Sequence, residues 1–111
     1  MKLPHKHYQD DDKIDFLIEE NKALDISKAF KHLGDPKRLQ IFWLLCHRKE
    51  CVINIAAIMD MSSPAVSHHL KILKMAGLIK SNREGKEMFY EADENMLSEF
   101  LYNVILKGKS L

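Results

Sequence analysis

Residues 61–77, M-S-S-P-A-V-S-H-H-L-K-I-L-K-M-A-G, predict one helix with a buried face and a polar face. Ser63 is a favourable N-cap, and Pro64 suits the first helical position, where its missing N–H costs no hydrogen bond. Apolar residues then recur at helical spacing before Gly77 supplies a stop signal: Val66, Leu70 and Leu73. The opposite face carries hydrogen-bond donors suited to phosphates and base edges: Ser67, His68 and Lys71.

The segments on either side of this helix predict a winged helix. Residues 54–60 form a short amphipathic segment, and the break at 61–63 joins it to the next helix as a helix-turn-helix over about 54–76. Residues 51–53 are expected to be extended. After the helix, residues 78–81 and 87–92 read as two strands around a turn that contains Gly85. The wing therefore spans about 78–92.

The distribution of charge favours duplex DNA as a partner. The net charge is only +1, but residues 26–90 carry eleven Lys or Arg against five Asp or Glu. We expect Ser63, Ser67, His68 and Lys71 to read the major groove, and Arg83 and Lys86 to grip phosphates or the minor groove. Lys31, Lys37 and Arg38 are candidates for further backbone contacts. The alternatives are ordinary surface charge and a solvated turn at the hairpin tip.

The rest of the chain predicts one mainly α-helical domain over 13–111, after a mobile tail over 1–12. A helix is expected from Lys13 to about His32, interrupted near Asp25 and ended by Gly34. Asp35 caps the next helix and Pro36 opens it, with Phe42 and Trp43 in the core. His69 is expected at the boundary of the core.

A last helix over about 94–106 is apolar on a wide arc, and the first helix is similarly rich in apolar residues. So small a domain has too little core to cover both helices. We therefore expect a homodimer joined through the first and last helices across a two-fold axis. The alternative is that the two helices pack on each other within one subunit.

Several classes of protein have little support in the sequence. No run approaches the roughly 18–20 apolar residues of a membrane span, and the N-terminus lacks a signal peptide, so we expect a cytoplasmic protein. No catalytic constellation or glycine-rich phosphate loop indicates an enzyme. The rival interpretation is a winged-helix protein-interaction module that does not bind DNA. Cys46 and Cys51 are expected to be thiols.

Three segments resemble the ArsR/SmtB family of winged-helix transcriptional regulators. They are L-G-D-P-K-R-L-Q-I at 33–41, S-S-P-A-V-S-H-H-L-K-I-L-K-M-A-G-L-I at 62–79 and R-E-G-K-E-M-F-Y at 83–90. The resemblance covers about residues 29–105. It implies a dimeric repressor that binds double-stranded operator DNA and releases it when a small inducer binds.

The resemblance also bears on the inducer. Cys51 matches one thiol of a family metal site that lies before the helix-turn-helix, but Ile53 and Asn54 replace two other residues of that motif. His5 and His7, followed by Asp10 to Asp12, are candidate further ligands for zinc or a similar divalent metal. The alternative is a small buried cysteine beside a loose tail. No His follows His69 and no Cys follows Cys51, so the family's sites on the last helix are expected to be absent. A local Cys46–Cys51 dithiol is a further alternative.

Overall fold

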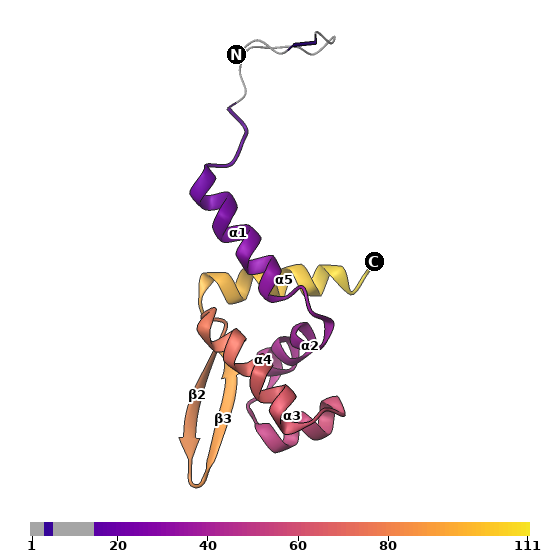
Figure 1. Cartoon of the computed structure of the whole chain (residues 1–111), viewed down its shortest axis with the longest axis vertical. Helices are drawn as coiled ribbons and strands as arrows, with labels where there is room; N and C mark the ends of the chain where they lie inside the picture. Colours follow the sequence, from indigo (N-terminus) through magenta and orange to yellow (C-terminus); the bar gives the residue numbers. More distant parts are fainter. Residues whose placement is uncertain (1–3, 6–14) are drawn as a thin grey trace.

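The computed structural model describes residues 4, 5 and 15–111. Its elements follow in the order α1 (Glu20–His32), α2 (Pro36–His47), β1 (Glu50–Cys51), α3 (Val52–Met59), α4 (Ser63–Met75), β2 (Ile79–Glu84), β3 (Glu87–Ala92) and α5 (Met96–Gly108). Figure 1 shows α2, α3 and α4 grouped beside the β2–β3 hairpin, with α1 rising away from them and α5 crossing near its lower end. The predicted winged helix-turn-helix with five helices is confirmed.

The core lies where α2, α3 and α4 meet the base of the sheet. Its largest fully buried side chains come from these three helices, from the residue directly before β2 and from α5: Ile41, Phe42, Leu45, Ile55, Val66, Leu70, Leu73, Leu78 and Leu101. Burying a Leu, Ile, Val or Phe side chain stabilises the fold by about 1.5–3 kcal/mol each. The three apolar residues predicted to anchor the 61–77 helix are all among them, so α4 is fixed by its inner face.

The helix-turn-helix differs slightly from the prediction at its boundaries. Ser62, rather than Ser63, is the N-cap of α4, and its hydroxyl accepts a hydrogen bond from the Ala65 N–H at 3.3 Å. Both serines are good caps, and the tight turn at Asp60 (φ 53°) places the first of them at the helix start. Ser63 then becomes the first helical residue. Val52 begins α3, so residues 52 and 53 are helical and not extended.

The sheet contains a third strand beside the wing: the extended piece predicted at 51–53 is a strand over Glu50–Cys51, and its pairing with the hairpin was not predicted. β2 and β3 pair from Ile79↔Ala92 to Glu84↔Glu87, which leaves a shorter turn than predicted. Gly85 in this turn has φ +65°, a conformation that favours glycine. β1 joins the other edge of β3, with Glu50 opposite Tyr90 and Cys51 opposite Phe89. The sheet order β1-β3-β2 attaches the hairpin to the end of α2.

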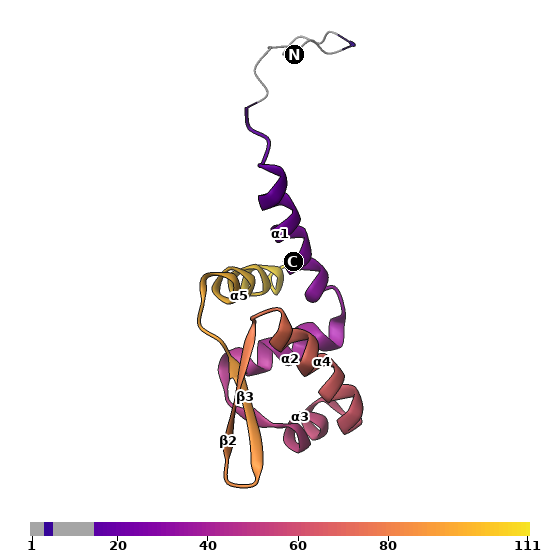
Figure 2. The same ribbon diagram turned by 60° about the vertical axis from the view of Figure 1, so that its left-hand side comes forward.

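The terminal helices lie at the edge of this unit, as the turned view in Figure 2 also shows, and each adds one buried residue to the core, Ala29 and Leu101. α1 begins at Glu20 instead of Lys13 and passes through Asp25 without interruption. α5 begins two residues later than predicted, where Asn95 and Ser98 form a reciprocal capping box. Trp43 is not in the core as predicted: it is half-buried and stacks on Tyr102 of α5 with ring centroids 5.0 Å apart. Among the described residues no helix is long and apolar enough to cross a bilayer.

Candidate nucleic-acid interface

The outer face of α4 presents the predicted DNA-reading residues together. Ser63, Ser67 and Lys71 are spaced four residues apart, so they drift by only about 40° per step around the helix. All three are exposed, as is the neighbouring His68. The buried Val66, Leu70 and Leu73 occupy the opposite arc. We call the exposed set Ser63, Ser67, His68 and Lys71 the reading face.

One further lysine on this side of α4 was missed by the sequence analysis. Lys74 is exposed, and its Nζ donates a hydrogen bond to Ser81 Oγ on β2 at 2.5 Å. The contact joins the last turn of α4 to the first half of the hairpin. The signal available in the sequence was the i, i+3 spacing of Lys71 and Lys74, which places both on one side of a helix.

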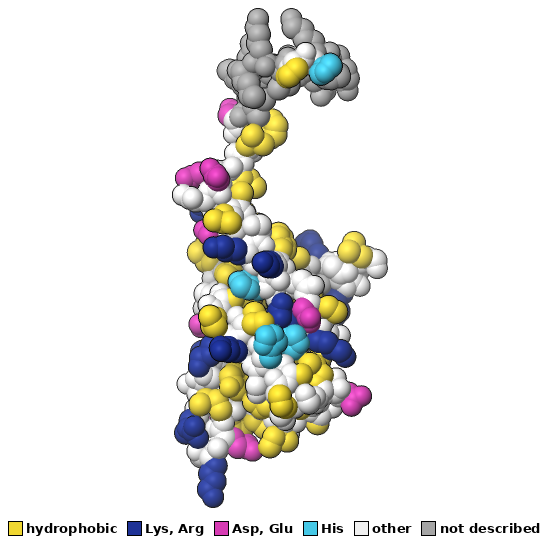
Figure 3. Space-filling model, viewed as in Figure 1, with side chains coloured by type: hydrophobic (Ala, Val, Ile, Leu, Met, Phe, Trp, Pro, Cys, Tyr) yellow, Lys and Arg dark blue, Asp and Glu magenta, His cyan; other side chains and the backbone are white. Residues whose placement is uncertain are grey.

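The wing carries the other two predicted cations at its far end. Arg83 is near the end of β2 and Lys86 is in the turn, and both are exposed. Elsewhere on the sheet, Lys49 pairs with Glu84, the last residue of β2, at 2.6 Å, and Lys80 pairs with Glu91 at 3.5 Å. Among the described residues the ion pairs do not include Arg83 or Lys86. Figure 3 shows Lys and Arg side chains reaching the tip of the hairpin at the bottom of the molecule.

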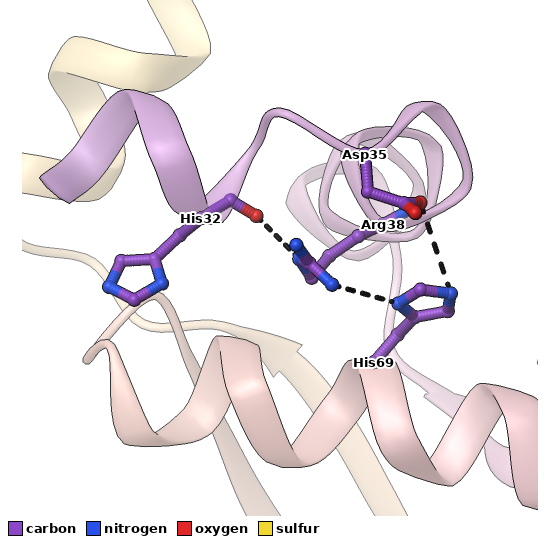
Figure 4. A network of polar contacts seen from close by, with 4 residues as sticks. All are labelled: His32, Asp35, Arg38 and His69. Atoms are coloured by element: carbon purple, nitrogen blue, oxygen red, sulfur yellow. Dashed lines mark hydrogen bonds and ion pairs between the residues drawn. The ribbon is translucent and has the colours of Figure 1, made fainter. Parts of the chain in front are cut away.

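Behind the reading face, a polar network joins three helices (Figure 4). Asp35 caps α2 by accepting from the Arg38 N–H at 2.9 Å. The Arg38 guanidinium bonds to the His32 carbonyl at the end of α1 through Nε (2.5 Å) and to His69 Nδ1 on α4 through Nη1 (3.2 Å). Arg38, a candidate for DNA contacts, therefore bonds to protein groups, and the predicted boundary position of His69 is confirmed by its 12% exposed side chain.

The contacts in this network shift the pKa values of Asp35 and His69. The backbone N–H of Arg38 lowers the pKa of Asp35 by stabilising the carboxylate. Burial lowers the pKa of His69 from its usual 6.5, and the neighbouring Arg38 and His68 act in the same direction. The Asp35 carboxylate opposes this shift from 3.9 Å. Burial therefore outweighs the carboxylate, and the neutral imidazole is favoured.

The candidate metal ligands are not brought together in the part of the chain that the structure describes. Cys51 is a buried thiol at the N-cap of α3, His5 is exposed, and His7 and Asp10 to Asp12 lie outside the described residues. The described residues contain no group of three or more His, Cys, Asp and Glu placed to hold a metal ion. Protein zinc sites use three or four protein ligands. The described part therefore supplies an incomplete ligand set.

Comparison with known proteins gives consistent matches. The family model described as "Bacterial regulatory protein, arsR family" matches residues 35–81. A CadC homolog of Staphylococcus aureus, a cadmium resistance transcriptional regulatory protein, is 32% identical over 86% of this chain and 78% of its own length. The transcriptional repressor SdpR of Bacillus subtilis is 34% identical over 75% of this chain and 96% of its own.

Solved structures agree with these matches. The homodimeric winged helix-turn-helix DNA-binding domain Mb0332 of Mycobacterium bovis has a TM-score of 0.71 at 26% identity, covering 84% of this chain and 88% of the other. The relatives are transcriptional regulators rather than enzymes. The resemblance to the ArsR/SmtB family is thereby confirmed: this chain belongs to the arsR family of bacterial regulatory proteins and is a sequence-specific DNA-binding transcriptional regulator.

Proposed function

We propose that this chain represses transcription as a homodimer bound to a double-stranded operator, and that a small inducer releases it. The observation that carries the proposal is the reading face of α4, which is exposed and polar while its opposite arc is fixed in the core. A helix with this arrangement fits the major groove of B-DNA, which is about 12 Å wide.

Each residue of the interface has a role that suits its chemistry. The hydroxyls of Ser63 and Ser67 donate to or accept from base edges or phosphates near the start of α4. His68 and Lys71 follow on the same side, where Lys71 places one cation against the backbone. Arg83 and Lys86 extend from the hairpin to the neighbouring phosphates or the minor groove. The Lys74–Ser81 bond keeps these two parts of the interface in register.

The proposed dimer explains the apolar surface of the terminal helices. Exposed large apolar residues lie on α1 and the residues before it (Phe16, Leu17, Ile18, Leu24, Ile26 and Phe30) and on α5 (Met96, Phe100, Val104 and Leu106). The rings of Phe30 and Phe100 meet edge to face with their centroids 6.1 Å apart, so the apolar surfaces of α1 and α5 adjoin. An exposed apolar surface of this extent marks an interface. Pairing through it presents two reading faces to half-sites about one helical turn apart.

A mobility-shift assay on the DNA upstream of the gene tests the proposal. We expect saturable binding to a short imperfect palindrome, weakened in the double variant Arg83→Gln/Lys86→Gln and retained in the control Lys22→Gln on α1. A protein that stays monomeric and ignores every duplex at low ionic strength contradicts the proposal. That result supports the rival function, a winged-helix module that binds another protein.

For the inducer we propose zinc or a similar divalent metal, held by Cys51 with His5 and His7. Support comes from the retained thiol directly before α3 and from the printed function of the Staphylococcus aureus relative, cadmium resistance regulation. The described residues do not complete the site by themselves, so the test must include the N-terminal segment. We expect near-stoichiometric zinc binding in calorimetry that weakens in Cys51→Ser and on removal of residues 1–12. Affinity unchanged by both alterations excludes these ligands.

A further inference from the structure

Arg38 occupies a position where three helices meet. Its guanidinium donates from Nε to the His32 carbonyl at the C-terminus of α1 and from Nη1 to His69 Nδ1 in the middle of α4. Its own backbone N–H is held by the N-cap carboxylate of Asp35. A guanidinium is a planar fork of donors, so one side chain can hold both acceptors at fixed angles. We call Arg38, His69 and the His32 carbonyl the clamp.

The clamp dictates the protonation state of His69. A guanidinium has N–H donors and no acceptor, so Nδ1 must accept and must lack a proton. The imidazole is then neutral with its proton on Nε2, which lies 3.9 Å from Asp35 Oδ1. A proton added at Nδ1 would point at an Arg38 N–H and remove the bond. The clamp therefore exists only while His69 is neutral.

We propose that Arg38 is a positioning residue for DNA binding, which orients α4 through neutral His69, and that protonation of His69 breaks this contact, lets α4 turn on its buried face and weakens binding. The inference rests on the proposed function. His69 is next to His68, which belongs to the reading face, so a rotation of α4 that follows loss of the clamp moves the reading face directly. The same guanidinium holds the end of α1, so the clamp also links the proposed dimer helix to the DNA-reading helix.

The charged groups around His69 set the sign of the pH dependence. Asp35 and Arg38 face it from α2, His68 adjoins it on α4, and α1 contributes the His32 carbonyl to Arg38, with the His32 ring turned away (Figure 4). Because burial lowers the pKa of His69 below 6.5, the unfolded chain binds more protons at this residue than the folded chain does. The contribution of neutral His69 to folding stability is therefore fully present above about pH 6.5. It is lost as the pH falls from there toward the lower pKa that His69 has in the folded protein.

Imidazole nitrogen NMR on the free full-length protein tests the clamp without DNA. We expect His69 as the Nε2–H tautomer, with a pKa that moves toward 6.5 in Arg38→Gln. The matched control Lys37→Gln removes the same charge from an exposed neighbouring side chain that makes no bond to α4. It should leave the His69 tautomer unchanged. The proposal is overturned if His69 is the Nδ1–H tautomer, or if His69 titrates identically in wild-type protein and in Arg38→Gln.

Fluorescence anisotropy with operator DNA tests the consequence for binding. Direct phosphate contact by His68 would strengthen binding at low pH, so the comparison is made in His68→Gln. We expect binding by His68→Gln to weaken about threefold to tenfold between about pH 7.5 and 5.5, and His68→Gln/His69→Gln to lose this dependence. Glutamine at 69 keeps an acceptor for Arg38 but cannot be protonated.

The outcomes separate the two proposals. If wild-type protein binds no operator, the proposed function fails. If wild-type protein binds, and His68→Gln and His68→Gln/His69→Gln show the same pH dependence of binding, only the clamp proposal fails. Arg38→Gln, which removes both the charge and the fork, should weaken binding while the salt slope stays at the wild-type value. A salt slope smaller in magnitude by about 2 per dimer would instead show that Arg38 contacts phosphates directly.

Discussion

Replacing Lys71 by Gln tests whether the reading face follows the DNA backbone as proposed. Lys71 is exposed on α4, and among the described residues no ion pair competes for it. Lys71, Arg83 and Lys86 give three candidate phosphate contacts per protomer, and therefore six per dimer; Lys74 is left out because its Nζ donates to Ser81. Lys49 and Lys80 are excluded from this count because carboxylates on the sheet already pair with them.

The expected magnitude follows from counterion release. Each phosphate neutralised on B-DNA contributes about −0.9 to the slope of log affinity against log salt, so six contacts give about −5. Lys71→Gln removes two contacts per dimer and leaves four, for a slope of about −3.5. Because the side chain is exposed and outside the core, the unfolding temperature should change little.

Fluorescence anisotropy with a labelled operator, titrated between about 50 and 200 mM salt, measures both slopes. Lys22→Gln on α1 is the matched control, since it removes the same charge from an exposed side chain outside the proposed DNA-contacting surface and should keep the wild-type slope. A Lys71→Gln slope equal to that of wild type refutes the placement of Lys71 at the backbone. A wild-type slope near zero refutes the electrostatic account as a whole.

Three other perturbations test separate features. Phe100→Glu places a charge in the apolar surface that α5 shares with α1, so the protein should shift from dimer to monomer. Light scattering measures this shift, and a dimer retained in the variant would place the interface elsewhere. Gly85→Val should lower stability by about 1–2 kcal/mol, because Gly85 has φ +65° with open space around it; Gly85→Asn should cost less, and equal melting temperatures would refute this. Burial raises the pKa of Cys46 to about 11, so its alkylation at pH 8 should be much slower than that of a free thiol, and fast labelling would contradict this.

The features predicted correctly from the sequence depend on local chemistry. Asp35 and Pro36 mark the start of α2, and Gly77, with φ +78°, follows the end of α4. Gly85 marks the turn of the wing. Each of these signals acts within a few residues, through a cap or a left-handed backbone conformation. One of the misplaced boundaries, at Ser62 and Ser63, lies where two adjacent residues are equally good caps.

The features that the sequence did not reveal depend on contacts between distant segments. β1 is only two residues long, and it is a strand because β3 offers it an edge. Trp43 lies half-buried outside the core because its ring stacks on Tyr102 of α5. Arg38 was a candidate for DNA contacts, yet it bonds to His69 thirty-one positions away. The sequence shows a cation at position 38, but only the fold decides which cations are paired inside the protein.

Internal pairing also explains how a chain with a net charge of +1 can present a cationic surface to DNA. On the sheet, Glu84 and Glu91 pair with Lys49 and Lys80, so these four side chains together contribute little net charge. Arg83, Lys86 and Lys71 remain at the hairpin tip and on α4, within reach of one duplex. Exposed charges separated by more than about 8–10 Å are largely screened at physiological salt, so local charge governs the approach to DNA rather than the total. Because the acidic excess lies in residues 1–25 and 91–111, outside the helix-turn-helix and wing, electrostatic steering favours docking through α4 and the hairpin.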